Sequence, residues 1–225
     1  MAEYSDPDLF LVGVRTPLVM DYADAARRRG LALAGLRVGN ATPRALQGAM
    51  AVIEIDEVPS AARGIPFIAG AFMPDRRREL VEFAVERGLA PAAALTDPTA
   101  AVSAWARLGA GTFIGAGAVV ASGVLVANHV FVNRASSLGH HTVVESFVSI
   151  GPGVTVPSSV NIGAGAIVGA GAVILPGIRI GAGAVIAAGT RVRKDVPADV
   201  LAFGEPVRTR PRKGLRILDE YRGQE

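Results

Sequence analysis

From Val102 to Val192 every sixth residue is valine, isoleucine or leucine, without a single interruption. The series comprises Val102, Leu108, Ile114, Val120, Val126, Val132, Leu138, Val144, Ile150, Val156, Ile162, Val168, Ile174, Ile180, Ile186 and Val192. Glycine follows many of these anchors directly, as in Ile114-Gly115 and Ile162-Gly163. Glycine at such a position allows a sharp turn that a side chain would obstruct. A period of six with a turn after each anchor is typical of a triangular parallel β-helix.

Three hexads close one coil of the β-helix, so residues 18 apart in sequence are expected to be spatial neighbours. The sixteen hexads give slightly more than five coils, and a prism of roughly 25 Å at the usual strand spacing. The uncharged segment 162–178 has the hydropathy of a membrane span. Its period of six and its glycine and proline content argue against a continuous helix, so we expect no membrane span there.

Strands alternate with helices in the N-terminal part of the chain, which predicts a small Rossmann-like parallel sheet. The predicted strands cover residues 9–14, 31–38, 66–72 and 91–95, and the predicted helices cover 18–29, after Thr16-Pro17, and 74–87. Residues 39–64 are ambiguous, with a short helix over 43–48 and a weak strand over 51–55. In such a sheet the ligand is expected at the carboxyl ends of the strands.

These patterns predict a Rossmann-like domain over residues 1–95, a β-helix over 96–200, and a basic C-terminal segment over 201–225. The basic residues of this segment are Arg208, Arg210, Arg212, Lys213 and Arg216. They are suited to the phosphates of a long anionic cofactor, or they belong to a solvated tail. A short helix over 215–221 would cap the open end of the prism.

Composition narrows the functions further. The chain contains no cysteine, which excludes disulfides, a thiol nucleophile and a cysteine-ligated metal. No secretory leader opens the sequence, so a cytoplasmic location is expected. The net charge of +3 is small, and basic residues do not alternate with aromatic ones, so nucleic acid is not an expected partner.

The turn after the first strand, Gly13-Val14-Arg15-Thr16, is a candidate phosphate site. Backbone amides at the start of the following helix and the Arg15 guanidinium would face an anion there. Every α/β unit has such a turn for structural reasons, and only one glycine of a dinucleotide motif is present, so both interpretations remain open.

Two histidines are adjacent at one predicted β-helix corner, in Leu138-Gly139-His140-His141. A histidine with a pKa near neutrality suits general-base catalysis, although a corner also tolerates any polar residue for structural reasons. The stacked neighbours of His140 are Ser122 and Ser158, which leave room for a substrate. A zinc site is not expected, because His129 lies 11 residues before His140 and cannot converge with it on one metal.

Several stretches resemble one family of bacterial sugar acetyltransferases, which join a Rossmann-like domain to a left-handed β-helix. The matching stretches are Leu95-Thr96-Asp97-Pro98-Thr99-Ala100, Val132-Asn133, Leu138-Gly139-His140-His141 and Gly204-Glu205-Pro206. The family includes N-acetyltransferases of nucleotide-linked 4-amino sugars and proteins similar to sialic acid O-acetyltransferases. The resemblance implies that the Rossmann-like domain is of the type that binds sugar nucleotides. It also implies a homotrimer that binds acetyl-CoA between two prisms, with a histidine as general base.

By position, the resemblance assigns the base to His140 and a supporting role to His141 and Asn133, with Asn133 also lining the substrate pocket. It implies an acetyl-CoA groove along Ser149, Ser158, Ala170, Ala188 and Gly189. The substrate would be held by Asn133 together with Gly13, Arg15 and Thr16.

The chain departs from the family at several of these positions. His141 stands where a carboxylate usually follows the base, and Ser149 and Ser158 replace a family histidine and glycine. After the second strand, Arg37-Val38-Gly39-Asn40 replaces the expected acidic residues. The preferred hypothesis is acetyl transfer from acetyl-CoA to the amine of an amino sugar that is nucleotide-linked. The alternatives are sugar O-acetylation and a trimeric binding or scaffold protein with weakened catalysis.

Overall fold

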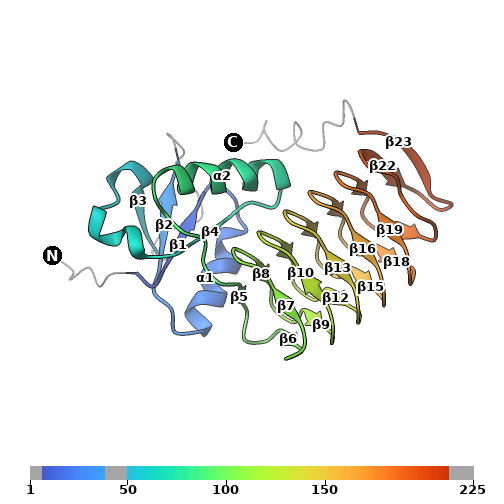
Figure 1. The fold of residues 1–225 in the computed structure, drawn as a ribbon, viewed down its shortest axis with the longest axis horizontal. Helices are drawn as coiled ribbons and strands as arrows, with labels where there is room; N and C mark the ends of the chain where they lie inside the picture. Colours follow the sequence, from blue (N-terminus) through green and yellow to red (C-terminus); the bar gives the residue numbers. More distant parts are fainter. Residues whose placement is uncertain (1–6, 39–49, 213–225) are drawn as a thin grey trace.

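The computed structural model describes residues 7–38 and 50–212. It shows a small α/β domain packed beside a parallel β-helix (Figure 1). The helices predicted over 43–48 and 215–221, and the basic residues Lys213 and Arg216, lie outside the described residues. No helix in the described part of the chain is long and apolar enough to cross a membrane.

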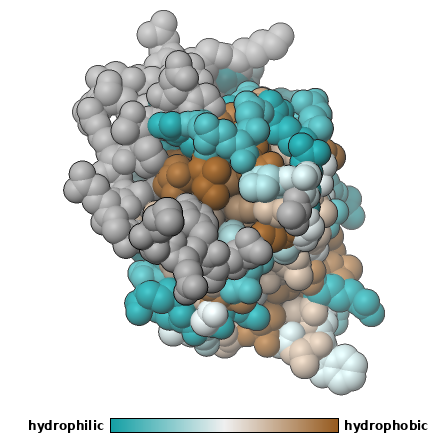
Figure 2. Space-filling model, turned by 90° about the vertical axis from the view of Figure 1, so that its left-hand side faces the viewer, coloured by the Kyte–Doolittle hydropathy of each residue, from teal (hydrophilic) through white to brown (hydrophobic). Residues whose placement is uncertain are grey.

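The N-terminal domain contains a four-stranded parallel sheet in the order β3-β2-β1-β4. Its elements are β1 (Leu9–Val12), α1 (Val19–Arg28), β2 (Leu33–Arg37), β3 (Ala51–Glu54), the 3₁₀ turns Ile55–Glu57 and Ser60–Gly64, β4 (Phe67–Ala69) and α2 (Pro74–Glu86). This confirms the predicted Rossmann-like architecture. The strand order reverses direction between β1 and β4, which is where open α/β sheets usually bind ligands. Figure 2 views the molecule from the end that carries the N-terminal domain. In this view, hydrophilic residues lie along the upper part of the surface, and a hydrophobic area lies below them.

Two details of this domain differ from the sequence prediction. Thr16 does not cap the first helix: α1 begins at Val19 with Leu18 as its N-cap, and the Thr16 hydroxyl accepts the Leu18 N–H at 3.3 Å. The predicted fourth strand is not part of the sheet either. Pro91 forms only an isolated bridge with Phe67, and Leu95–Thr96 (β5) pairs with Phe113–Ile114 (β8) in the β-helix. The segment after residue 91 turns away because its last residues already follow the β-helix register.

The β-helix has three sides, each a sheet built from two-residue strands that pair in parallel with a spacing of 18 residues; the eight-stranded side ends in two longer strands, β22 and β23. The five-stranded side contains β7 (Arg107–Leu108), β10 (Leu125–Val126), β13 (Val143–Val144), β16 (Asn161–Ile162) and β19 (Arg179–Ile180). The six-stranded side contains β6 (Ala101–Val102), β9 (Val119–Val120), β12 (Ser137–Leu138), β15 (Thr155–Val156), β18 (Val173–Ile174) and β21 (Arg191–Val192). The eight-stranded side contains β5, β8, β11 (Phe131–Val132), β14 (Ser149–Ile150), β17 (Ile167–Val168), β20 (Val185–Ile186), β22 (Val200–Phe203) and β23 (Arg208–Pro211).

The predicted hexad register is confirmed: each anchor is the second residue of its strand, and the anchors from Ile114 onward are buried. Val144, Ile162 and Ile180, for example, are register partners in consecutive coils and share one core. Burial of this aliphatic column is the main force that holds the coils together.

The chain after residue 200 is not a simple tail. Strands β22 and β23 form an antiparallel hairpin that extends the eight-stranded side. Arg208 and Arg210 belong to β23, and both guanidinium groups lie within 6 Å of the Phe203 ring, at 5.4 and 5.6 Å. An edge strand rich in arginine disfavours pairing with another sheet, so the hairpin protects the open end of the prism.

The N-terminal domain covers the outer face of the eight-stranded side. Phe113 and Phe131 project outward from it and pack on Tyr22 of α1, with ring centroids 4.2 and 5.9 Å away. Further along the same side, Ile167, Val185 and Leu201 pack against Phe72 and Met73. One side of the prism is therefore a domain interface.

Arg77 of α2 connects the two domains from within this interface. Its side chain is 1% exposed, and its nitrogens donate to the carbonyl oxygens of His129, Ala71, Phe72, Phe147 and Val148 and to the Ser149 hydroxyl, at 2.6–3.0 Å. Burial lowers the pKa of Arg77 to about 10, which still leaves the group charged at neutral pH. Carbonyl oxygens, rather than a carboxylate, compensate this buried charge.

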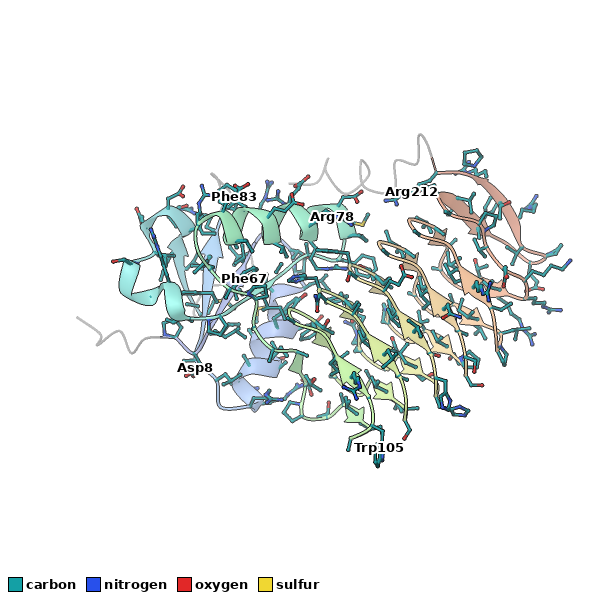
Figure 3. All side chains as sticks on the ribbon, in the orientation of Figure 1. Asp8, Phe67, Arg78, Phe83, Trp105 and Arg212 are labelled. Atoms are coloured by element: carbon teal, nitrogen blue, oxygen red, sulfur yellow. The ribbon has the colours of Figure 1, made fainter. Side chains whose placement is uncertain are left out.

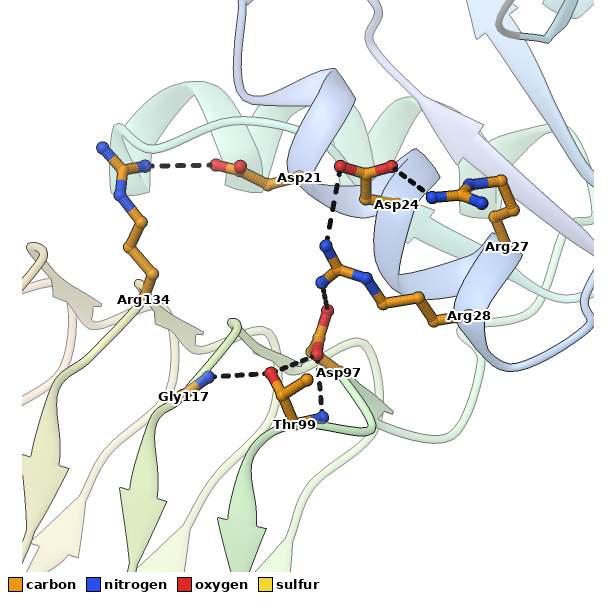
Figure 4. Close-up of polar contacts among 8 residues, drawn as sticks. All are labelled: Asp21, Asp24, Arg27, Arg28, Asp97, Thr99, Gly117 and Arg134. Carbon is orange, nitrogen blue, oxygen red and sulfur yellow. Dashed lines mark hydrogen bonds and ion pairs between the residues drawn. The ribbon is translucent and has the colours of Figure 1, made fainter.

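A second link joins α1 to the first coil (Figure 4). Arg28 pairs with the buried Asp97 at 2.6 Å, while the other Asp97 oxygen accepts from the hydroxyl and N–H of Thr99. The Thr99 hydroxyl in turn accepts the Gly117 N–H of the next coil at 3.0 Å. Burial acts to raise the pKa of Asp97, but the Thr99 and Arg28 donors outweigh it and hold that pKa below its ordinary value.

Replacing Asp97 by asparagine should lower the free energy of unfolding at neutral pH by about 1–3 kcal/mol, because charge-assisted hydrogen bonds are lost. A carboxylate with a depressed pKa stabilises the fold above its unfolded-state pKa and stops doing so as the pH falls through its folded pKa. The difference in the free energy of unfolding between wild type and Asp97→Asn, measured by urea unfolding, should therefore become smaller below about pH 4. Arg28→Ala should behave similarly, whereas Arg27→Ala, which removes an exposed ion pair with Asp24, should change little. A pH-independent difference would contradict this role for the Asp97 charge.

Candidate active site

Three edges separate the sides of the prism, and the predicted site residues fall on different ones. The histidine edge consists of the turns 103–106, 121–124, 139–142, 157–160 and 175–178. The asparagine edge consists of the turns 97–100, 115–118, 133–136, 151–154, 169–172 and 187–190. The third edge consists of the turns 109–112, 127–130, 145–148, 163–166 and 181–184.

His140 and His141 are exposed on the histidine edge, with ring centroids 5.5 Å apart and ring planes nearly perpendicular at 86°. The His141 ring lies against Gly123 in the preceding coil, where a Cβ would come within 3.2 Å of its Cδ2. Ser158 follows one coil later on the same edge and is half-buried. A small residue on each side leaves the His140 ring open to a substrate.

The asparagine edge carries Asn133 together with the exposed residues Ala170, Ala188 and Gly189. Asn133 is 6% exposed, and its side-chain oxygen accepts the Arg134 N–H at 2.7 Å. Residues 170 and 188 are one coil apart and present only methyl groups, which leaves a smooth strip along this edge. Helix α1 runs beside the same edge, since Arg28 contacts Asp97 and Asp21 lies 3.8 Å from Arg134 (Figure 4).

Ser149 does not line a groove, contrary to the sequence prediction. It is completely buried in the domain interface, where its hydroxyl contacts the Phe72 carbonyl oxygen and accepts from Arg77. Every polar contact of this hydroxyl is to protein, so a cofactor entering from solvent cannot reach it. Ser149 points outward from the prism but is buried, because the N-terminal domain covers the eight-stranded side.

The turn at Gly13, Arg15 and Thr16 offers a phosphate fewer amides than the sequence suggests. The Gly13 N–H donates to the Leu36 carbonyl oxygen at 2.9 Å, and the amides of Leu18 and Val19 are occupied by Thr16. Gly13 itself is required, because its φ is +87° and a Cβ would lie 2.4 Å from Leu80. Arg15 is exposed at the carboxyl end of β1, the position that a ligand of this sheet would approach.

His129 lies on the third edge, away from His140. It stacks on Phe147 at 5.1 Å, and burial together with the nearby Arg77 charge lowers its pKa to about 4, so it is neutral at physiological pH. Within residues 7–38 and 50–212, no three histidine, aspartate or glutamate side chains are grouped so that they could hold a metal ion.

In one chain, the histidine edge and the asparagine edge are separated by the full width of the six-stranded side. The candidate base and the smooth strip at Ala170 and Ala188 therefore do not meet within a single prism. Two copies of the chain that present different edges to one groove would bring them together. Trp105 also lies on the histidine edge and is 80% exposed.

Comparisons with known proteins agree with this architecture. Residues 159–194 match the family model of the bacterial transferase hexapeptide with six repeats. No curated protein matches the chain significantly in sequence.

Several solved structures have the same two-domain fold. The acetyltransferase domain of PglB from Neisseria gonorrhoeae, solved with acetyl coenzyme A, is 25% identical, with a TM-score of 0.80 over 89% of this chain and 97% of that one. A perosamine N-acetyltransferase variant from Caulobacter crescentus, solved with CoA and GDP-perosamine, is 22% identical, with a TM-score of 0.77 over 90% and 96%. WeeI from Acinetobacter baumannii is 20% identical, with a TM-score of 0.74 over 90% and 99%. The repeats match that family model, and the shared two-domain architecture makes the chain similar to sugar acetyltransferases that join a Rossmann-like domain to a hexapeptide-repeat β-helix.

Proposed function

We propose that the protein transfers the acetyl group of acetyl-CoA to the amine of a nucleotide-linked amino sugar, with His140 as the general base. The observation that carries this proposal is the exposed His140 on a corner whose stacked neighbours, Ser122 and Ser158, are small. The similarity to enzymes solved with acetyl coenzyme A and with GDP-perosamine supports the two substrates.

In the reaction, the acceptor amine attacks the thioester carbonyl carbon. The C–N bond of the amide forms as the C–S bond breaks, and the proton lost by the amine passes through the His140 ring to the departing thiolate of CoA. No acyl-enzyme is proposed, because the chain has no cysteine and no serine is paired with a base in the sequence. Backbone N–H groups in the groove would stabilise the negative charge on the carbonyl oxygen.

The proposed site lies between two copies of the chain in a homotrimer. One copy supplies His140 and Ser158 from its histidine edge. The other supplies the asparagine edge, with Asn133, Ala170, Ala188 and Gly189, and the adjacent carboxyl end of β1 with Gly13, Arg15 and Thr16. Acetyl-CoA would lie along the smooth strip, and the acceptor would enter from the N-terminal domain.

Release of the CoA thiol tests the activity directly, with UDP- and GDP-linked 4-amino sugars as the first acceptors. The chain contains no cysteine, so a thiol reagent reacts only with the product. Treating the product with hydroxylamine distinguishes an ester from an amide, and a hydroxylamine-labile product would establish O-acetylation instead. A protein that binds no acetyl-CoA by calorimetry would be a scaffold, and the proposal would be wrong.

Two inactive variants should complement each other if the site lies between copies. His140→Ala damages the histidine edge, and Ala188→Trp blocks the asparagine edge. In randomly mixed trimers each site draws one edge from each neighbour, so co-expression should restore roughly a quarter of the wild-type activity. Light scattering should give about three times the 23.1 kDa chain mass. A monomer, or mixed trimers without activity, would place the site within one chain.

A further inference from the structure

One guanidinium on the asparagine edge is held only loosely by the protein. The side chain of Arg134 is 60% exposed, and its one ion pair within the described part of the chain is with Asp21 of α1, at 3.8 Å (Figure 4). This separation is too long for a hydrogen bond. The guanidinium therefore keeps its N–H donors available for a ligand.

The backbone that carries Arg134 is fixed, in contrast to the end of its side chain. The side-chain oxygen of Asn133 accepts the Arg134 N–H at 2.7 Å, and the Arg134 carbonyl oxygen accepts the Gly153 N–H of the next coil at 3.1 Å. The stacked positions in the neighbouring coils are Ala116 and Pro152. These short side chains leave space for a ligand beside the guanidinium.

Arg134 is the only cation on the asparagine edge. The turns of this edge, all within the described residues, contain two charged side chains, Arg134 and Asp97, and Asp97 is already paired with Arg28. A single guanidinium among small neutral residues is suited to a compact anion. Phosphate groups match its planar arrangement of donors.

The position of Arg134 suits the acceptor rather than acetyl-CoA. Its partner Asp21 lies in the first turn of α1, the helix that follows β1. Open α/β sheets bind ligands at the carboxyl ends of their strands, which is where this helix begins. The strip at Ala170 and Ala188 lies two and three coils further along the same edge, or about 10 and about 15 Å at the usual strand spacing.

The histidine edge brings no such cation to the proposed site. Its turns between residues 103 and 178 contain no lysine or arginine. Trp105 of this edge projects from the lower side of the prism, whereas α2 lies along the upper side (Figure 3). Of the two edges that form the proposed site, only the asparagine edge contributes a positive charge.

We propose that Arg134 binds the diphosphate of the nucleotide-linked acceptor, and that Asp21 holds the guanidinium in position until the acceptor arrives. This inference rests on the proposed function. On binding, the guanidinium exchanges its long contact with Asp21 for charge-assisted hydrogen bonds to phosphate oxygens. All nucleoside diphosphate sugars contain this group, so Arg134 contributes affinity for UDP- and GDP-linked acceptors alike.

Calorimetry with UDP and GDP tests the subsite without any acetyl transfer. Arg134→Ala should weaken the binding of both nucleotides roughly 10- to 100-fold, with a smaller loss for Arg134→Lys. The loss should also be smaller for UMP and GMP, which carry one phosphate. Arg107→Ala is the matched control, because Arg107 is exposed on the five-stranded side, opposite the asparagine edge. Equal affinity of wild type and Arg134→Ala for UDP and GDP would overturn the proposal.

Acetyl-CoA also contains a diphosphate, so it serves as the competing ligand. Arg134→Ala should bind acetyl-CoA with wild-type affinity, because the strip at Ala170 and Ala188 is unchanged. A loss of affinity for acetyl-CoA without a loss for UDP and GDP would assign Arg134 to the acetyl donor and overturn the proposal.

Asp21 provides a test with the opposite sign. Its half-buried carboxylate would repel a diphosphate, so Asp21→Asn should strengthen UDP and GDP binding about 2- to 5-fold, the effect of one exposed ion pair. Asp24→Asn is the control, because Asp24 pairs with Arg27 and Arg28 instead. Weaker nucleotide binding in both Asp21→Asn and Arg134→Ala would show that their ion pair only joins the two domains.

The thiol-release assay on the same variants separates this inference from the proposed function. Weaker UDP and GDP binding by Arg134→Ala, without acetyl transfer to any acceptor in the wild type, would contradict the proposed function and leave the diphosphate subsite standing. Acetyl transfer with a KM for the acceptor that Arg134→Ala does not raise would contradict the subsite and leave the function standing.

Discussion

Replacing His140 by alanine is expected to lower kcat by about 10²- to 10⁴-fold, the usual contribution of a general base. The reason is geometric: among the described histidines only His140 and His141 are exposed, while His129 is buried and lies on a different edge. Acetyl-CoA should bind His140→Ala with nearly wild-type affinity, because the smooth strip at Ala170 and Ala188 is unchanged. Steady-state kinetics with calorimetry for acetyl-CoA measures both quantities.

His141 provides the matched control for this prediction. His141→Ala should lose less activity than His140→Ala, because His141 stands in the position of an orienting group. His141→Glu restores the carboxylate expected there, and an increase in kcat would show that an orienting anion was missing. Retained activity in His140→Ala, or its abolition in His141→Ala alone, would reverse the assignment of the base.

Replacing Arg77 by alanine is expected to lower the free energy of unfolding by about 3–5 kcal/mol, which is typical when one partner of a buried charged network is removed. The variant would leave the carbonyl oxygens of His129, Phe147 and Val148 buried without their donor. For a chain of this length the melting temperature should fall by about 6–20 °C.

Arg76 is the control for Arg77, because it is the adjacent residue on α2 but is exposed and, among the described residues, forms an ion pair only with Glu79. Arg76→Ala should change the melting temperature little. Arg77→Lys should also be destabilised, since an ammonium has fewer donors than a guanidinium and lacks its planar geometry. A melting temperature of Arg77→Ala equal to that of Arg76→Ala would show that the network is not needed for stability.

The repeat made the β-helix predictable in detail. A hydrophobic period of six determines which residue of each strand faces the axis, so the register from Ile114 onward follows without knowledge of distant contacts. The α/β domain was predicted less well at its ends. The segment 91–95 has the composition of a strand. Its composition does not determine whether it pairs with the N-terminal sheet or with the β-helix.

The burial of Ser149 could not be predicted from the hexad register alone. Ser149 is the outward residue of its strand, and outward residues are exposed or half-buried on two sides of the prism but buried on the third. The sequence does not state which side the N-terminal domain covers. The burial of Arg77, in contrast, could have been predicted from the sequence. Arg77 shares one face of α2 with four buried residues, Pro74, Leu80, Val81 and Ala84. A lone arginine on an apolar helical face is a reason to expect a buried network of carbonyl partners.

The N-terminal domain is fastened to both ends of the repeat array, and this changes how the array should unfold. At one end Arg28 holds Asp97, and at the other Arg212 donates to the Gly183 carbonyl oxygen and lies 3.5 Å from Asp75 at the start of α2. Repeat arrays ordinarily open coil by coil from their termini, because each coil contacts only its neighbours. Here neither terminal coil can separate without first breaking contacts with the N-terminal domain. The same domain also binds the middle coils through the hydrogen bonds of Arg77. The prism and the α/β domain should therefore melt together as one cooperative unit, without a population of partly unwound prisms.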